Sequence, residues 1–296
     1  MVKKTNDFSL NKRISKTLEI VEKRGYNLTI EKLSEYLIGG KININDLKKN
    51  IKNFKDIDFD GTFIATKGNL KAEKCKKRKK TNEILQPIYS RVLKEYVNDF
   101  VKFCPWTQCI MISGSMATDG LGENDDIDIN IVVKDFSKYK CYLLALLISL
   151  KYSIKYKKLF NAKYFNFLKK VICINVIWEE HQVLPFIRKD GQIAYELINA
   201  KILYNPEFFS KMLDHNKWLN NWFPQIYERD YFSKKAINKK SNKKSSKFIE
   251  YISMKLFFCL FKIVKMTRTK NKILLDRMDY VESVKHPYGF FDIPKR

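Results

Sequence analysis

The sequence predicts an α+β fold with a small N-terminal module, a central sheet region and a helical C-terminal region. Two observations support this prediction. Residues 14–54 carry apolar side chains at helical spacing in three successive segments, and the hairpin signal "IDFDGTFIA" follows them. Beyond residue 104, the short apolar runs "TQCIMI", "DIDINIVV" and "VICINVIW" have the character of strands and are separated by helical segments.

The N-terminal module has the element order of a winged helix. Thr29 is expected to cap the second helix and Asn45 the third. The third helix carries lysines that would suit contact with nucleic-acid phosphates: Lys48, Lys49 and Lys52. A packing module of the same architecture, with its lysines merely in solvent, explains this part of the sequence equally well.

Composition favours a folded, basic protein with an anionic partner. The chain has 296 residues, 45% of them hydrophobic, and a formal net charge of +25. Genomic base composition explains part of this charge, but lysines gathered in blocks favour nucleic acid as a partner. One block is either a solvated helix face or a track for a phosphate backbone, and consists of Lys76, Lys77, Arg78, Lys79 and Lys80.

Cysteine and apolar patterns argue against several classes. The six cysteines form no CxxC pair and only three histidines are present, which disfavours zinc and indicates reduced cysteines in a cytoplasmic protein. The longest apolar stretches are too short or too interrupted by lysine to span a bilayer, so no membrane partner is expected. The oligomeric state is left open.

Three further segments have predicted conformations. Pro87 is expected to start a new helical segment within the basic connector. The stretch "GQIAYELINAKILYN" is expected to be an amphipathic helix. A helix beginning at Phe248 is expected to dock onto the domain, with lying on a membrane as the alternative, through a stripe of Ile252, Leu256, Leu260 and Ile263.

These patterns divide the chain into six regions. They are a winged-helix-like domain (1–68), a basic helical connector (69–103), a sheet core (104–185), a helical extension (186–231), a flexible basic loop (232–247) and a C-terminal helical region (248–296).

The run "DDIDINIVV" concentrates acidic residues on one face of a predicted strand. Alternation places Asp126 and Asp128 on the side opposite Ile127 and Ile129, with their Cα atoms roughly 6–7 Å apart. Carboxylates this close can bind hard cations, and without cations they repel each other. Upstream, the turn of Ser113, Gly114 and Ser115 follows an apolar strand and can bring backbone N–H groups and a hydroxyl to a phosphate.

In order and spacing, these residues resemble the DNA polymerase β-like nucleotidyltransferase superfamily. Its signature, a hydrophobic residue, Gly and Gly or Ser, and then two acidic residues alternating with hydrophobic ones, is matched by "ISGS", ten residues and "DIDI". The surrounding sequence is similar to that of a prokaryotic subset of this superfamily whose members have a winged-helix-like N-terminal region. The matching segments are "ISGSMA…NDDID", "VICINVI" and "AYELINAKILYN", and the resemblance covers about residues 104–224.

The resemblance implies a minimal mixed sheet flanked by helices and a catalytic role for both aspartates. Asp126 and Asp128 would bind two Mg²⁺ ions, or Mn²⁺, and Ser113, Gly114 and Ser115 would hold the phosphates of an NTP. The reaction would transfer NMP to a hydroxyl acceptor, such as the 3′ end of tRNA or DNA, with release of pyrophosphate.

One position departs from the family pattern. Active members usually carry a third carboxylate on a neighbouring strand, whereas this sequence has Asn175 at the matching position. Asn175 can offer a carbonyl oxygen but no charge, and Glu179, at the same strand parity, is a candidate substitute if the strand bends. The departure keeps two alternatives open: a nucleic-acid-binding or regulatory protein with a degenerate core, and an enzyme that nucleotidylates a protein or small molecule.

Overall fold

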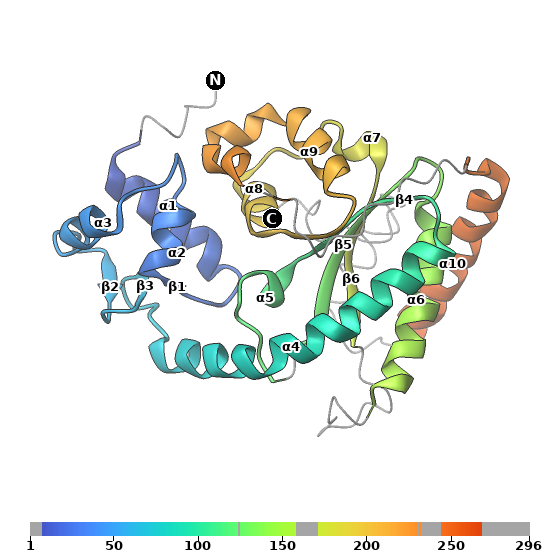
Figure 1. The fold of residues 1–296 in the computed structure, drawn as a ribbon, viewed down its shortest axis with the longest axis horizontal. Coiled ribbons are helices and arrows are strands. Elements are labelled where there is room, and N and C mark those ends of the chain that lie inside the picture. Colours follow the sequence, from blue (N-terminus) through green and yellow to red (C-terminus); the bar gives the residue numbers. More distant parts are fainter. Residues whose placement is uncertain (1–7, 124, 158–170, 230, 232–243, 268–296) are drawn as a thin grey trace.

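A computed structural model of the chain describes residues 8–123, 125–157, 171–229, 231 and 244–267. These residues form an α+β fold, as the sequence predicts, with a smaller sheet at the left of Figure 1 and a larger one to the right of its centre. The smaller sheet, within residues 28–66, has three strands, and the larger one, within residues 107–204, has four. None of the described helices is long and apolar enough to cross a bilayer.

The N-terminal module confirms the predicted order of three helices and a hairpin. Its elements are α1 (Leu10–Glu22), β1 (Leu28–Thr29), α2 (Ile30–Glu35), α3 (Ile44–Ile51), β2 (Ile57–Phe59) and β3 (Phe63–Thr66). Thr29 caps α2 by accepting the backbone N–H of Lys32. The predicted cap of α3 is wrong by two positions, because Asn43 is extended and its side chain accepts the N–H of Asn45 at 2.8 Å.

The basic connector is one helix, α4 (Ala72–Phe103), which runs from beneath the N-terminal module to the larger sheet (Figure 1). The expectation that Pro87 begins a new segment is wrong, since Pro87 lies inside this helix. A proline removes one backbone donor from a helix interior, which is unfavourable by itself. Packing of the following turns offsets that cost, because Tyr89, Tyr96 and Phe100 are all buried.

The larger sheet is mixed. It consists of β4 (Thr107–Ile112), β5 (Ile127–Val133), β6 (Ile172–Glu179) and β7 (Lys201–Tyr204). The β5–β6 pair is parallel, whereas β4 pairs antiparallel with both β5 and β7. The helix predicted through residue 205 ends early, because α8 (Gly191–Asn199) is followed by β7. In β7, buried Ile202 and Tyr204 alternate with less buried neighbours, which is the periodicity of a strand.

Helices cover both faces of this sheet. On one face, α4, α6 (Lys138–Lys155) and α10 (Lys247–Thr267) enclose a cluster that contains the isoleucines of β5. The opposite face shares a second cluster with α8, α9 (Pro206–Asp214) and the N-terminal module. Short elements complete the described fold: α5 (Gly114–Ala117), α7 (Glu180–Val183), η2 (Lys217–Asn221) and η3 (Pro224–Glu228). The N-terminal module therefore shares its core with the helical extension.

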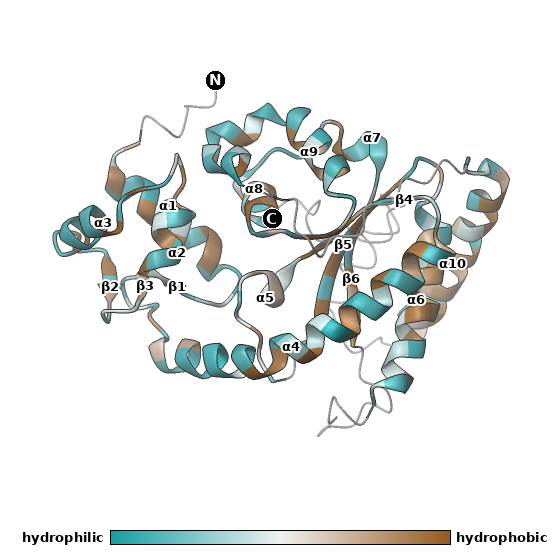
Figure 2. Ribbon diagram, viewed as in Figure 1, coloured by the Kyte–Doolittle hydropathy of each residue, from teal (hydrophilic) through white to brown (hydrophobic). Residues whose placement is uncertain are grey.

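Helix α10 docks onto the domain, but through a face other than the predicted one. The side chains of the predicted stripe are between 44% and 54% exposed, and they are Ile252, Leu256, Leu260 and Ile263. Figure 2 shows that much of α10 is hydrophobic, and its apolar side chains include both the exposed stripe and the buried Phe257. The helix packs through its aromatic side, where the Phe257 ring centroid lies 5.5 Å from that of Tyr139 and 5.4 Å from that of Tyr142. Buried Glu250 reinforces this choice by accepting the backbone N–H groups of Tyr139 and Lys140. Residues 232–243 of the predicted basic loop and residues 268–296 lie outside the described residues.

Candidate functional site

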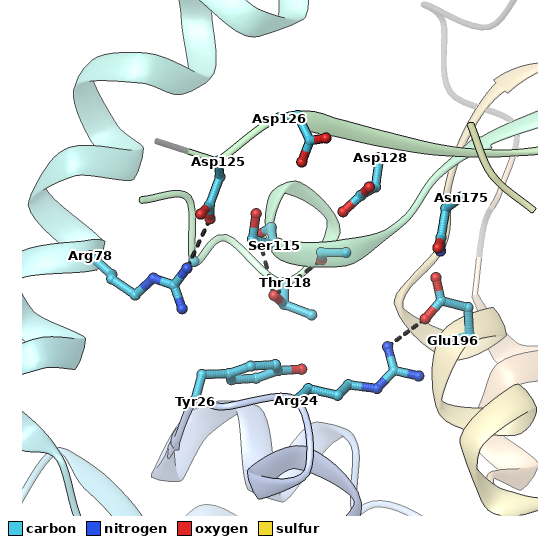
Figure 3. A pocket seen from close by; sticks show the side chains of 12 residues that line it. Arg24, Tyr26, Arg78, Ser115, Thr118, Asp125, Asp126, Asp128, Asn175 and Glu196 are labelled. Carbon is cyan, nitrogen blue, oxygen red and sulfur yellow. Dashed lines mark hydrogen bonds and ion pairs between the residues drawn. The ribbon is translucent and has the colours of Figure 1, made fainter. Parts of the chain in front are cut away.

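A cavity of about 330 Å³ lies where the acidic end of β5 meets α5, α8 and the N-terminal module. Five residues predicted for the metal and phosphate site line it: Gly114, Ser115, Asp126, Asp128 and Asn175. Figure 3 shows the two aspartates directed toward the α5 turn from one side, with residues of the N-terminal module on the other. Residues far apart in the chain thus meet around one polar space.

The acidic pair lies on one face of β5, as the alternation of the strand predicts. Ile127 and Ile129 are fully buried on the opposite face, whereas Asp126 and Asp128 are partly exposed to the cavity. The thiol of Cys173 joins them, because ligand atoms of these three residues lie within 4.8 Å of one another. Cys173 sits opposite Asp128 in the parallel β5–β6 pair, so both side chains point to the same face.

The donor set determines which ion would fit. Carboxylate oxygens suit hard cations such as Mg²⁺ and Mn²⁺, whereas a thiol prefers softer metals. Asp126 and Asp128 therefore fit Mg²⁺, and Cys173 adds no good ligand for it. Cys173 was not predicted for the site, although it lies two positions before Asn175 and therefore has the same strand parity.

The turn between β4 and α5 brings the backbone against the acidic pair. The N–H of Ser113 donates to the backbone carbonyl of Asp128 at 2.9 Å. Gly114 has φ +62°, and a Cβ at this position would lie 2.2 Å from Oδ2 of Asp128. Only glycine therefore permits this approach. Because α5 is a single turn, a phosphate here would depend on nearby N–H groups and the Ser115 hydroxyl more than on a helix dipole.

Strand β6 contains a bulge at the position where a third carboxylate was sought. Ile129 pairs with Ile174, but Asn130 pairs with Val176, which leaves Asn175 as the extra residue. The Asn175 side chain lines the cavity and donates from Nδ2 to Oγ of Ser113 at 3.2 Å. The Asn175 side chain therefore points into the site, as predicted, but it brings no negative charge.

The same bulge removes Glu179 from the site. Beyond the bulge the parity of β6 changes, and Glu179 pairs with Val133, whose side chain belongs to the apolar cluster on the opposite face. Glu179 accepts the N–H of Ser137 at 3.2 Å and forms a capping box with Gln182 at the start of α7. The expectation that Glu179 shares the face of Asn175 is therefore wrong.

Besides Arg78, Thr118 and Gly120, four polar residues that were not predicted for the site line the cavity. They are Arg24 and Tyr26 from the N-terminal module, Asp125 from the loop before β5 and Glu196 from α8 (Figure 3). Arg24 forms an ion pair with Glu196, and Asn130 donates from Nδ2 to Glu196 at 3.2 Å. Tyr26 donates its hydroxyl to that of Tyr195 at 3.1 Å, and its burial raises the pKa of this phenol.

The charge of Arg24 is secured by its partner. Although burial alone lowers the pKa of the guanidinium, the Glu196 carboxylate raises the pKa overall. One local signal was available for this pair, because Glu196 is the only charged residue within the otherwise uncharged run "AYELINA". No local signal links it to Arg24, which precedes it by 172 positions.

The predicted nucleic-acid contacts divide into two groups. Lys48, Lys49 and Lys52 are exposed on α3, at the end of the N-terminal module away from the cavity (Figure 1). On α4, one member of the basic block turns inward: Arg78 lines the cavity and pairs with Asp125 at 2.8 Å. The remaining members are exposed on the same helix: Lys76, Lys77, Lys79 and Lys80. Of the two predicted groups, the basic block on α4 therefore borders the cavity, through Arg78, and the lysines of α3 do not.

No protein-family profile matches the chain, and no curated protein matches it. The resemblance in sequence motif accordingly rests on the residues themselves.

Proposed function

We propose that this protein is a Mg²⁺-dependent nucleotidyltransferase of the DNA polymerase β-like superfamily, which transfers NMP from an NTP to a hydroxyl acceptor. One observation carries the proposal. Asp126 and Asp128 face one cavity at the start of β5. Gly114 lies so close to Asp128 that a residue with a side chain would not fit at this position. A phosphate-binding turn that touches a pair of carboxylates is the arrangement that metal-assisted phosphoryl chemistry needs.

Each element of the site has a role in the proposed reaction. Asp126 and Asp128 would hold the metal, with Mn²⁺ as an alternative to Mg²⁺, and Gly114 and Ser115 would hold the outer phosphates of the NTP. Bound Mg²⁺ supplies Lewis-acid polarisation and neutralises the negative charge of the phosphates. The acceptor hydroxyl would lose its proton to solvent as its oxygen forms a bond to the α-phosphorus. The bond from that phosphorus to the bridging oxygen would break, and pyrophosphate would leave.

Nucleic acid is the acceptor class that the charge distribution favours. The chain has a net charge of +25, and the exposed lysines of α4 provide a basic surface on the helix that carries Arg78. Arg78, on the same helix, reaches the cavity itself. We therefore expect a 3′ hydroxyl of RNA or DNA to approach along α4.

A second candidate is a nucleic-acid-binding protein whose nucleotidyltransferase core is inactive. The observation that favours it is the chemistry of β6, which presents the neutral amide of Asn175 to the cavity and places the thiol of Cys173 beside the two aspartates. This candidate predicts salt-sensitive binding of RNA or DNA that survives loss of both aspartates and needs no NTP.

The test is transfer of label from α-labelled NTPs to RNA or DNA in the presence of Mg²⁺. The Asp126→Asn/Asp128→Asn variant preserves side-chain volume and should lower transfer by at least ~10³-fold, because it removes the charge that holds the metal. Asp135→Asn is the matched control, since Asp135 is a partly exposed aspartate that pairs with His181 at 2.8 Å. This control should label the acceptor as the unaltered protein does.

Equal labelling by the double variant and the unaltered protein would contradict the proposed metal site. Absence of labelling from both proteins, together with salt-sensitive nucleic-acid binding by both, would favour the second candidate.

A further inference from the structure

Glu196 is a buried carboxylate that faces the same cavity as the acidic pair. Its side chain is only 3% exposed, and it approaches from α8, on the side of Asn175 (Figure 3). Asn130, which follows Asp128 on the same face of β5, donates to Glu196 from Nδ2 at 3.2 Å. Glu196 therefore lies on the side of the strand that carries Asp126 and Asp128. In this structure it lies outside the group of Asp126, Asp128 and Cys173, whose ligand atoms are within 4.8 Å of one another, so its carboxylate must move toward the pair to share an ion with them.

The proposed metal site lacks a third hard, charged ligand from the sheet. Asn175 is neutral and Cys173 is soft, so neither replaces a carboxylate. Asp125 also lines the cavity, but its carboxylate accepts the N–H of Gly122 at 2.8 Å and pairs with Arg78. Among the described residues that line the cavity, Glu196 is then the carboxylate left to complete the set.

In this structure the Glu196 carboxylate is engaged in an ion pair with Arg24. The guanidinium also donates from Nη2 to the backbone carbonyl of Gln192 at 3.2 Å, which fixes it against α8. Arg24 lies just beyond α1, so the pair joins the N-terminal module to the cavity. The side chain of Arg24 is 19% exposed, and it lines the cavity that a nucleotide would enter.

We propose that Glu196 is the third carboxylate of the metal site, and that Arg24 masks it until a phosphate of the substrate draws the guanidinium away. This inference rests on the proposed function. Arginine pairs with phosphate through two parallel hydrogen bonds, which lets a phosphate compete with a single carboxylate. Once released, buried Glu196 is an unpaired charge, and a cation beside Asp128 relieves it. Metal and phosphate binding are then coupled, and each strengthens the other.

The experiment measures binding of Mn²⁺ to the full chain by electron paramagnetic resonance, with and without an NTP analogue that has an imido group between its α- and β-phosphorus atoms. Glu196→Gln keeps the side-chain volume and should weaken Mn²⁺ binding in the presence of the analogue about 10- to 100-fold. Without the analogue, its affinity should match that of the unaltered protein. Glu250→Gln is the matched control, because Glu250 is a buried carboxylate on the opposite side of the sheet.

Removal of the mask gives the opposite result. Arg24→Gln should bind Mn²⁺ about tenfold more tightly than the unaltered protein when no analogue is present, because Glu196 is then available. The combined variant Arg24→Gln/Glu196→Gln should bind Mn²⁺ as weakly as Glu196→Gln alone. Tighter binding that persists in the combined variant would show that Arg24 acts by charge alone and would overturn its role as a mask of Glu196.

The outcomes separate this inference from the proposed function. Unchanged Mn²⁺ binding in Glu196→Gln, with binding lost in Asp126→Asn/Asp128→Asn, overturns the inference and leaves the proposed function standing. Absence of Mn²⁺ binding by the unaltered protein under both conditions overturns the metal site itself. Circular dichroism confirms the fold of each variant, and Glu196→Gln decides the question even if Arg24→Gln does not fold.

Discussion

The two faces of β5 differ in what they contribute to this protein. Ile127, Ile129 and Ile131 are fully buried in the cluster beneath α4, α6 and α10. Asp126 and Asp128 stand on the other face and border a polar cavity. Because side chains alternate along a strand, one short run can anchor the sheet and also hold two like charges beside each other. The apolar face offsets the repulsion that the acidic face introduces.

Strand β6 also has side chains on both faces of the sheet, but its alternation is interrupted. It keeps alternation up to Ile174, and the bulge at Asn175 then shifts the parity of everything that follows. The bulge directs Asn175 into the cavity and Glu179 out of it. In a regular strand the side chains alternate predictably between the two faces. The one inserted residue in β6 turns the Glu179 carboxylate away from the cavity, where it caps α7 instead.

The largest expected effect separates the two faces of β5 by stability. Ile129→Ala should lower the free energy of unfolding by about 2–5 kcal/mol, because it opens a cavity in the apolar cluster. Asp128→Asn should change the same quantity by less than about 1 kcal/mol in metal-free buffer, since it removes a like-charge contact with Asp126. Urea unfolding of both variants measures the difference. A loss in Asp128→Asn as large as that in Ile129→Ala would mean that the acidic face is structural.

A smaller effect is expected where the turn touches the acidic face. Gly114→Ala should cost about 1–3 kcal/mol of stability, because φ is +62° and the new Cβ would displace the Asp128 carboxylate. Nucleotide transfer should fall more than ~10-fold through the same displacement. Gly120→Ala is the control, since its Cβ would meet its nearest neighbour, Oγ1 of Thr118, at an ordinary 3.7 Å. Equal behaviour of the two variants would contradict the close approach.

The smallest effect concerns the attachment of the N-terminal module to the site face. Asp119 pairs with Lys32 of α2 at 2.9 Å and with Lys201 of β7 at 2.5 Å. Burial alone raises the pKa of Asp119, but these two ammonium groups lower it overall. The pair energy is therefore present above the unfolded pKa of about 4 and is lost as pH falls through the lower folded value.

Asp119→Asn should remove this acid dependence at a cost of less than about 1 kcal/mol near neutral pH, because Asp119 is 42% exposed and solvent screens the pairs. Urea unfolding between pH 3 and pH 7 measures the change. The exposed Asp214–Lys217 pair provides the control through Asp214→Asn. A slope against pH that is unchanged in Asp119→Asn would contradict a contribution from this ion-pair cluster.

Features set by a few neighbouring residues could be read from the sequence. The alternation of β5 places Asp126 and Asp128 together because the period of a strand is a property of its own backbone. The cap at Thr29 is formed with the N–H three residues ahead, and is local for the same reason. The choice between Asn43 and Asn45 as the cap of α3 was missed, since both residue types are good caps and the helix start differs by only two positions.

Features that depend on partners distant in the chain could not be read in this way. Helix α10 has apolar side chains on two sides, so its own sequence does not decide which side docks. Contacts of Phe257 with Tyr139 and Tyr142 of α6 decide it. Pairing with β4 made β7 a strand, against the helical pattern that precedes it.

The chemistry of the cavity divides along the same line. Alternation and turn residues suffice to bring two carboxylates to one face and a glycine beside a strand end, since each involves neighbours in the chain. The bulge at Asn175 is a property of the pairing between two strands, and the Arg24–Glu196 ion pair joins residues 172 positions apart. Both follow from packing of the whole domain, because buried charges and sheet register are settled by partners that only the folded chain brings together.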